Sequence, residues 1–235
     1  MDSIQRRGFL GKLLGAASAL GVSLTSSAAA ASAQAPAADG WLKDVKGTHR
    51  CLFDFPKHSN GVGLLHILNY LSTYSAAYKA APGTVGAVGT LYGIGPGASI
   101  SLGFNDAMWA KYALGEYTGL KDAAGKPYAR NPFHRPTKDE LHLVMQAMQT
   151  PIIPMFADAM PAIGIESLQK MGTKFLMCNN AFGAWCAELE ARGKGNAAAL
   201  QTELGANLLP GVTIVPAMVI AIDQAQAAGI AYNRQ

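Results

Sequence analysis

The sequence predicts an α/β protein, a three-layer sandwich in which helices cover both faces of a mainly parallel sheet of about five strands. Short apolar runs of strand length alternate along the chain with longer stretches of helical periodicity, as expected of parallel strands joined by helices. The clearest case is the apolar run at 174–178, which is followed by a helix-forming stretch at 181–191. A continuous apolar strand of this kind is typically buried on both faces. Half of the 235 residues are hydrophobic, which is enough for one well-buried domain.

The expected domain, residues 48–235, follows a leader at 34–47 whose Ala/Pro-rich start predicts flexibility. Proline, glycine and capping residues separate its elements, and Asn105 and Thr137 are candidate helix caps. The expected elements, in order, are a strand at 49–55, a helix capped by Ser59 or Asn60 and running to 81, a strand at 84–92, helices at 105–114 and 139–148, a short buried segment at 151–155, a helix at 167–171, a strand at 174–178, a helix at 181–191, a strand at 213–215, a helix at 218–228 and an edge strand at 230–232.

Apolar spacing and small residues justify the first of these elements. Leu64, Leu68 and Leu71 recur at helical spacing and give the first helix an apolar face. In the second strand, Gly86 and Gly89 allow neighbouring segments to approach closely.

Two stretches lack a clear period. Residues 116–137 are rich in Gly, Pro, Lys, Tyr and Asn. A loop of this length in a compact domain is usually functional or an oligomer contact. A second polar, Gly-containing stretch, at 193–205, is assigned neither a helix nor a strand.

Residues 1–33 have the features of an export signal. A paired arginine, Arg6-Arg7, stands before an apolar, small-residue segment at 13–24, and Ala31 and Ala33 form a small-x-small cleavage site. This arrangement predicts cleavage after Ala33. The apolar segment is too short and too rich in Gly and Ser to span a bilayer stably.

The core of this signal, the arginine pair followed by Gly8, Phe9 and Leu10, resembles a twin-arginine signal. We therefore expect the twin-arginine export machinery to carry the protein to the periplasm. Gln5 and Gly11 depart from the usual pattern, so a general secretory signal is the alternative.

The charge of the predicted mature chain gives no case for binding nucleic acid. The full chain has a formal net charge of +4, and residues 1–33 contain three basic residues and one acidic residue, so cleavage leaves +2 (4 − 3 + 1). A nearly neutral chain lacks the basic surface that a phosphate backbone requires.

Cys178 stands at the carboxyl end of the strand at 174–178. In open α/β sheets, ligands and reactive groups lie at the carboxyl ends of strands. A cysteine there is placed for chemistry, and the N–H groups at the start of the following helix favour its thiolate form. The alternative is a small residue buried under the helix, which is how most free cysteines behave.

The other two cysteines are poor disulfide partners for Cys178. Cys51 begins its strand, whereas Cys178 ends one, so parallel pairing places them at opposite ends of the sheet. Cys186 lies eight residues further along, near the third turn of the following helix. Six or so helical residues already rise about 9 Å, which exceeds the separation of about 6 Å that a disulfide allows between Cα atoms. We expect Cys51 to be a core residue. Three cysteines in an oxidising compartment leave at least one thiol unpaired.

The second half of the chain resembles the DsrE/DsrF-like family. The order and spacing of its motif residues extend over about 170–235, and residues 48–81 fit more loosely. The insertion at about 93–150 is longer than compact members of the family need. The residues that carry the resemblance are Gly172, Lys174, Phe175, Leu176, Cys178, Asn179, Asn180 and Ala181, then 208–217, then Gln224, Gly229, Ala231 and Tyr232.

This resemblance implies a flavodoxin-like sheet and homo-oligomers, often trimers or hexamers. Sulfur-relay members of the family carry a persulfide on a cysteine that corresponds to Cys178. The relay proteins are cytoplasmic, whereas this chain has an export signal, and Asn179-Asn180 match the uncharacterised branch better. The fold therefore transfers more readily than the activity.

Several residues are candidate partners of Cys178. His58 follows the first strand, faces the same carboxyl-end crevice and is a candidate base for the thiol. The loop at 93–99 fits G-x-G-x-x-A only loosely, because it does not follow the first strand and no acidic residue ends the next one, so phosphate binding is weakly indicated. The candidate ligand contacts are Asn60, Asn179, Asn180, Gly93 and Gly95.

The leading functional hypothesis is an exported protein that handles sulfane sulfur or binds a small ligand through Cys178, with a small sulfur species or an acceptor thiol as its partner. One alternative is a non-catalytic oligomeric protein-interaction module, and another is a copper- or haem-associated periplasmic protein. The histidines lack metal-ligand spacing. Thioethers suit copper(I) but also fill irregular cores, so we predict no metal site and no cofactor from Met145, Met148, Met155 and Met160.

Overall fold

The computed structural model describes residues 39–235. The predicted export signal, residues 1–33, and the first five residues of the predicted leader at 34–47 lie outside the described residues. The rest of that leader differs from the prediction of flexibility. Gly40–Lys43 form a short 3-10 helix, η1, and the Trp41 side chain is buried against the sheet. The large apolar surface of an indole favours this packing over a free leader.

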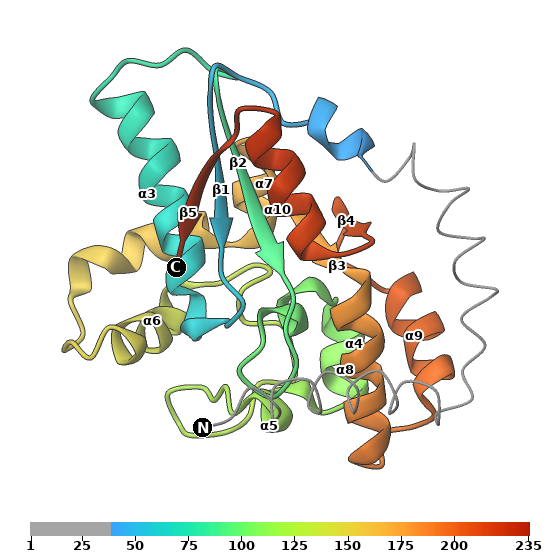
Figure 1. Ribbon diagram of the computed structural model, residues 1–235. Coiled ribbons are helices and arrows are strands. Elements are labelled where there is room, and N and C mark those ends of the chain that lie inside the picture. The colour runs from blue at the N-terminus through green and yellow to red at the C-terminus, as the bar shows by residue number, and fades with distance from the viewer. Residues whose placement is uncertain (1–38) are drawn as a thin grey trace, which may run out of the picture. The chain divides into compact units, whose positions relative to one another are not determined.

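The predicted α/β architecture is confirmed by a sheet of five parallel strands in the order β4-β3-β2-β1-β5. β5 is an edge strand, as predicted, and all of its residues are exposed. The strands are β1 (His49–Asp54), β2 (Val85–Leu91), β3 (Thr173–Cys178), β4 (Val212–Val215) and β5 (Ala231–Arg234) (Figure 1).

Helices cover both faces of this sheet and give the flavodoxin-like, three-layer arrangement. Helices α3 (Val62–Ala76) and α7 (Ile165–Lys170) pack on one face, whereas α10 (Met218–Ala227) and η1 pack on the other. Right-handed crossovers account for this division. The steps from β1 to β3 run in one direction and place their helices on one face, and the return step from β4 to β5 places α10 on the opposite face.

Further helices lie beyond the carboxyl ends of the strands. Figure 1 shows α4, α5, α8 and α9 beyond the arrowhead of β2. The bounds are α4 (Asp106–Lys111), α5 (Leu114–Thr118), α6 (Leu141–Ala147), α8 (Asn179–Ala191) and α9 (Ala197–Ala206), with 3-10 segments η2 (Ser59–Gly61), η3 (Ser99–Gly103), η4 (Lys138–Glu140) and η5 (Pro154–Ile163).

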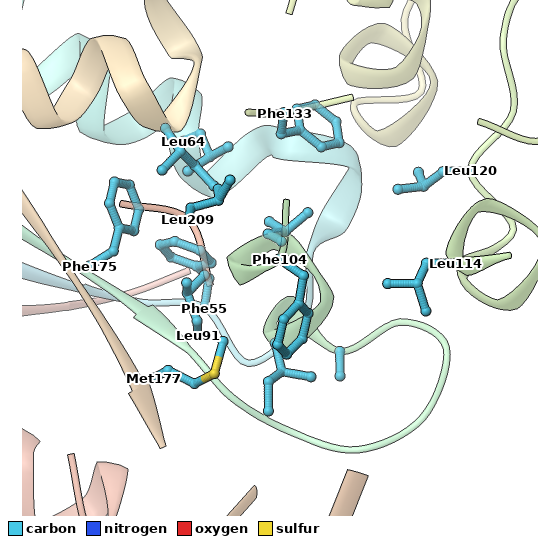
Figure 2. Packing of buried hydrophobic residues seen from close by; sticks show 14 of the residues in the cluster. Phe55, Leu64, Leu91, Phe104, Leu114, Leu120, Phe133, Phe175, Met177 and Leu209 are labelled. Atoms are coloured by element: carbon cyan, nitrogen blue, oxygen red, sulfur yellow. The ribbon is translucent and has the colours of Figure 1, made fainter. Parts of the chain in front are cut away.

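One continuous apolar core joins these helices to the α3 face of the sheet. Figure 2 shows Phe175 and Leu91 of the sheet in the same cluster as Phe104 and Phe133, which come from the predicted insertion. Phe104 stacks on Trp185 of α8 with the ring centroids 5.2 Å apart and the planes 7° apart. Because each such side chain contributes about 1.5–3 kcal/mol on burial, the insertion is an integral part of the domain.

Several local predictions are confirmed. Asn105 caps α4 by accepting a hydrogen bond from the Met108 N–H, and Thr137 forms a capping box with Glu140. The two glycines of β2 permit close packing, as expected. A Cβ at Gly86 would lie 2.3 Å from the Lys46 carbonyl oxygen, and one at Gly89 would lie 2.5 Å from the Phe175 ring.

Several local predictions are wrong. The N-cap of α3 is Gly61, without a side-chain hydrogen bond, and not Ser59 or Asn60. The helix expected at 105–114 ends at Lys111. The stretch at 193–205 contains helix α9, whose cap Asn196 accepts hydrogen bonds from two backbone N–H groups. The segment at 151–155 is not buried. Ile152 and Met155 are exposed, and Pro154 begins the 3-10 helix η5. Helix α3 ends at Ala76 instead of residue 81, and Lys79 then takes a left-handed conformation with φ of 56°.

Candidate functional site

Cys178 lies at the carboxyl end of β3, as predicted, and is also the N-cap of α8. Its Sγ accepts a hydrogen bond from the Ala181 N–H at 3.4 Å and another from the Met218 N–H at 3.3 Å. Ala181 lies in the first turn of α8, and Met218 is the first residue of α10. The N-termini of two helices therefore meet at one sulfur atom.

The order of the strands explains this meeting point. β3 and β4 are parallel neighbours, and Cys178 pairs with Val215, the last residue of β4. Only Pro216 and Ala217 separate β4 from α10, so the first turn of α10 begins beside that of α8. Met218 is the first residue of α10, and its N–H has no carbonyl partner within the helix, so it is free to donate to the sulfur.

The unpaired N–H groups at a helix start carry partial positive charge, and they stabilise an anion that accepts their hydrogen bonds. At Cys178 both hydrogen bonds reach the sulfur, the atom through which cysteine acts as a nucleophile. The side chain is also well covered, with 5 % of the residue exposed, and it packs among Val215, Met218 and other apolar residues. The next two residues, Asn179 and Asn180, are exposed and form the adjoining surface.

The other cysteines have a different environment. Cys51 and Cys186 are as well buried as Cys178, with 6 % and 1 % exposed, and all three are free thiols. Burial raises the pKa of Cys51 to about 11 and that of Cys186 to about 12. Cys51 belongs to the core, as predicted, and it lies level with the opposite end of β3 because both Cys51 and Thr173 pair with Ala87.

The structure does not bring His58 into contact with Cys178. His58 Nδ1 accepts a hydrogen bond from the Asn60 N–H at 3.1 Å, and the buried Nε2 has no hydrogen-bond partner among the described residues. Asn60 lies in the same turn and has a left-handed backbone with φ of 47°. The sequence therefore placed His58 and Asn60 correctly at the end of β1 but not beside the thiol.

Burial lowers the pKa of His58, so the folded protein favours the neutral ring. The carbonyl groups of Pro96 and Thr118 lie near the ring and partly oppose this shift, although neither meets hydrogen-bond geometry with Nε2. Because the unfolded chain binds a proton more readily at this position than the folded protein does, acidification favours unfolding.

We expect the free energy of unfolding to fall as the pH is lowered from neutrality through 6.5, the ordinary pKa of histidine. The His58→Gln variant is expected to lose less stability over the same interval. Chemical denaturation at a series of pH values measures both slopes. His134 keeps part of the slope in the variant, because burial and then the neighbouring Arg135 lower its pKa too. Equal slopes in the two proteins would contradict a buried neutral His58.

The loop that contains Gly93 and Gly95 is already occupied by a protein carboxylate. The Gly95 N–H donates to Glu188 of α8 at 2.7 Å, and Glu188 also accepts hydrogen bonds from Tyr117 and Arg192. Both glycines have positive φ, and a Cβ at Gly93 would lie 2.9 Å from the Pro56 carbonyl oxygen. Gly95 therefore joins the loop to α8, and its N–H is not free for a phosphate.

Sequence reasoning missed a buried polar cluster at the carboxyl end of β1. Asp54, with 5 % of the residue exposed, accepts hydrogen bonds from Tyr92 at 2.8 Å, Tyr232 at 2.7 Å and Thr90 at 3.2 Å. Tyr92 directly follows β2. Leu91, the residue before Tyr92, is paired with Met177, the residue before Cys178, so Tyr92 leaves the sheet next to Cys178. The signal that was available is an acidic residue between two phenylalanines at the end of an apolar strand.

Metal and membrane features are absent from the part of the chain that the structure describes. Within residues 39–235, no three His, Cys, Asp or Glu side chains gather as a metal ion requires. In the same range, no helix has the length and apolar character needed to cross a bilayer. Of the four methionines considered for copper, Met145 and Met160 are buried in the core, whereas Met148 and Met155 are exposed.

Comparison of the chain with protein-family models, with curated proteins and with solved structures finds no match. The case for a function therefore depends on the residues and their geometry.

Proposed function

We propose that the protein is an exported, DsrE-like sulfur carrier in which Cys178 accepts sulfane sulfur as a persulfide and passes it to an acceptor thiol. The observation that carries this proposal is the pair of backbone hydrogen bonds from Ala181 and Met218 to the Cys178 sulfur. They come from two helix N-termini, and the cysteine stands at the end of a central strand, where α/β proteins carry their reactive groups.

The transfer requires no oxidant or cofactor. The Cys178 thiolate attacks the outer sulfur of a donor persulfide, R–S–SH, and forms a new S–S bond. The S–S bond of the donor breaks, and the thiolate R–S⁻ leaves with the electron pair. In the second step an acceptor thiolate attacks the outer sulfur of the Cys178 persulfide, and Cys178 leaves as a thiolate.

The two N–H groups serve both steps, because charge resides on the Cys178 sulfur before the first attack and after the second. The apolar residues around the sulfur keep bulk water away, which strengthens these hydrogen bonds. The exposed amides of Asn179 and Asn180 are suited to contact a small polar donor at the adjoining surface.

The proposal includes export to the periplasm by the twin-arginine route and self-association. Exposed Val219 and Ile220, at the start of α10 beside Met218, support a protein contact, with 72 % and 51 % of their surface accessible. Light scattering that finds only a monomer would remove self-association from the proposal, and a preserved signal sequence in the exported protein would remove the cleavage.

Treatment of the folded protein with polysulfide, followed by peptide mass spectrometry, tests the sulfur-carrier function. We expect a mass increase of one sulfur atom on the Cys178 peptide, its loss after incubation with a small thiol, and no such adduct in the Cys178→Ser variant. Cys51 and Cys186 serve as internal controls, because their raised pKa values keep them protonated. An adduct that is absent from Cys178, or equal on all three cysteines, would refute the proposal.

A further inference from the structure

An exposed arginine stands at the same end and on the same face of the sheet as Cys178. Arg234 is the last residue of β5 and pairs with Asp54, the last residue of β1. Leu52, two residues before Asp54, packs in the same cluster as Cys178 against α10. Because side chains alternate between the faces of a strand and paired residues share a face, Asp54 and Arg234 both project on the side of α10. Figure 1 shows β1 and β5 side by side at one edge of the sheet.

This edge is also where the order of the strands reverses. From β1 the chain proceeds through β2 and β3 to β4, and it then returns to place β5 on the other side of β1. The crevice outside the carboxyl ends of strands at such a reversal is the common ligand site of open α/β sheets. Asp54 and Arg234 are the last residues of the two strands concerned, so both stand at this crevice.

The positive charge of Arg234 acts on the polar cluster around Asp54. The pKa of Tyr92 is raised by burial and then by its hydrogen bond to Asp54, whereas the charge of Arg234 opposes these effects. The pKa of Tyr232 is raised first by its hydrogen bond to Asp54, and Arg234 opposes this shift too. Tyr92 donates to one Asp54 oxygen and Tyr232 to the other. The guanidinium therefore lies near both tyrosines, whose hydroxyls already hold the carboxylate.

The other arginines that the structure describes have partners within the fold. Arg130, Arg135 and Arg192 each form an ion pair with a glutamate, and Arg50 donates to a backbone carbonyl at 2.8 Å. Arg234 is exposed and forms no ion pair within residues 39–235. A guanidinium without a carboxylate partner can bind a carboxylate from solution through paired N–H groups.

The register of the sheet gives the separation of Arg234 from Cys178. Arg234, Asp54, Thr90 and Leu176 lie level with one another on four neighbouring strands, and Cys178 is two residues beyond Leu176. Three strand spacings of about 4.8 Å and two residues of about 3.3 Å place the Cα atoms of Arg234 and Cys178 about 16 Å apart. The long arginine side chain can shorten the gap between its guanidinium and the sulfur to about 10 Å. An inorganic sulfur anion is too small to contact both groups, whereas a peptide-sized thiol is long enough.

Tyr92 occupies the surface between the sulfur and the guanidinium. It follows Leu91, which pairs with Met177, so its backbone is next to Cys178, whereas its hydroxyl reaches Asp54 at 2.8 Å. The Tyr92 side chain therefore runs from β2 toward β1, across part of the gap. It is partly exposed, and an aromatic surface of this kind gives an apolar contact for the middle of an extended molecule.

We propose that Arg234 binds a carboxylate of the sulfur donor, and that this donor is the persulfide of a small peptide thiol. Its carboxylate and its outer sulfur are about 10 Å or more apart, as the positions of Arg234 and Cys178 require. The inference rests on the sulfur-carrier function of Cys178. The Cys178 thiolate attacks the outer sulfur of R–S–SH, the S–S bond of the donor breaks, and the peptide thiolate leaves with the electron pair.

Three sulfur donors test this role of Arg234 in the full chain. They are glutathione persulfide, which is a tripeptide persulfide with two carboxylates, the persulfide of glutathione diethyl ester, which has none, and inorganic polysulfide. Peptide mass spectrometry of Cys178 at a series of times and donor concentrations gives the half-saturating concentration of each donor. We expect Arg234→Gln to raise this concentration at least about tenfold for glutathione persulfide and to leave the ester and polysulfide unchanged.

A matched variant and the inorganic donor separate the possible failures. Arg135→Gln removes an exposed arginine that pairs with Glu166, and it should accept sulfur from all three donors as the unmodified protein does. If polysulfide places no sulfur on Cys178, the carrier function fails and the inference about Arg234 fails with it. If polysulfide reacts but Arg234→Gln uses glutathione persulfide normally, or the ester reacts as well as the acid, the role of Arg234 alone is overturned.

Discussion

Replacement of Asp54 by alanine is expected to lower the free energy of unfolding by about 3 kcal/mol, because hydrogen bonds to a buried charged group contribute about 1.5–3 kcal/mol each and their partners are left unsatisfied. Asp54 accepts hydrogen bonds from Thr90 of β2, from Tyr92, which directly follows β2, and from Tyr232 of β5. The carboxylate therefore joins the edge strand β5 to two central strands.

The loss is smaller than the sum of three such bonds. Tyr92 and Tyr232 are partly exposed, so their hydroxyls can turn to water, whereas Thr90 is fully buried but keeps the Phe53 carbonyl as a second acceptor. Denaturant unfolding of Asp54→Ala measures the total. Tyr232→Phe removes one donor and is expected to cost about 1.5 kcal/mol. A stability of Asp54→Ala within about 0.5 kcal/mol of the unmodified protein, the usual range for surface changes, would contradict this role.

Replacement of Gly115 by alanine is expected to destabilise the fold by about 3 kcal/mol, the upper part of the usual range for overpacking. Gly115 is a buried residue of α5, and a Cβ there would lie 2.1 Å from the backbone oxygen of Tyr128 and 2.6 Å from its backbone nitrogen. Both atoms belong to the main chain, so the contact cannot be relieved by a change of rotamer. The segment after α5 has to move away from the helix.

Gly183 of α8 is the matched control. A Cβ at this position would have only the end of the Gln201 side chain nearby, at 3.8 Å. The Gly183→Ala variant is therefore expected to gain about 0.5–1 kcal/mol, because alanine restricts the unfolded chain and favours the helix. Thermal or denaturant unfolding of both variants checks the pair. Effects of the same sign and size in the two would show that the packing of Gly115 against Tyr128 is not as described.

The elements that the sequence predicted well are those with strong local signals. Strand β3 is a continuous apolar run, and the N-termini of α4 and η4 have capping side chains. Helix α9 was missed because it is mostly alanine and polar residues, with only Leu200 and Leu204 buried. Its stability comes from packing against α8, which a periodicity argument does not detect.

The candidate site was predictable only in part. The position of Cys178 follows from the end of its own strand, but the second hydrogen-bond donor, Met218, lies 40 residues away and is brought there by the pairing of β3 with β4. The Asp54 cluster likewise joins residues that are 36 to 178 positions apart. Contacts of this kind depend on strand order, which a single sequence does not specify.

The central claim is that Cys178, whose sulfur accepts hydrogen bonds from two helix N-termini, is the nucleophile among the three cysteines. The most direct measurement is the rate at which iodoacetamide modifies each cysteine of the folded protein near neutral pH, followed peptide by peptide and normalised to the rates in denaturant. All three cysteines are similarly buried, so exposure alone does not separate them. We expect Cys178 to react at least about tenfold faster than Cys51 and Cys186, since burial raises the pKa of those two thiols and keeps them protonated. A Cys178 that reacts no faster than the other two, or only after unfolding, would contradict the account.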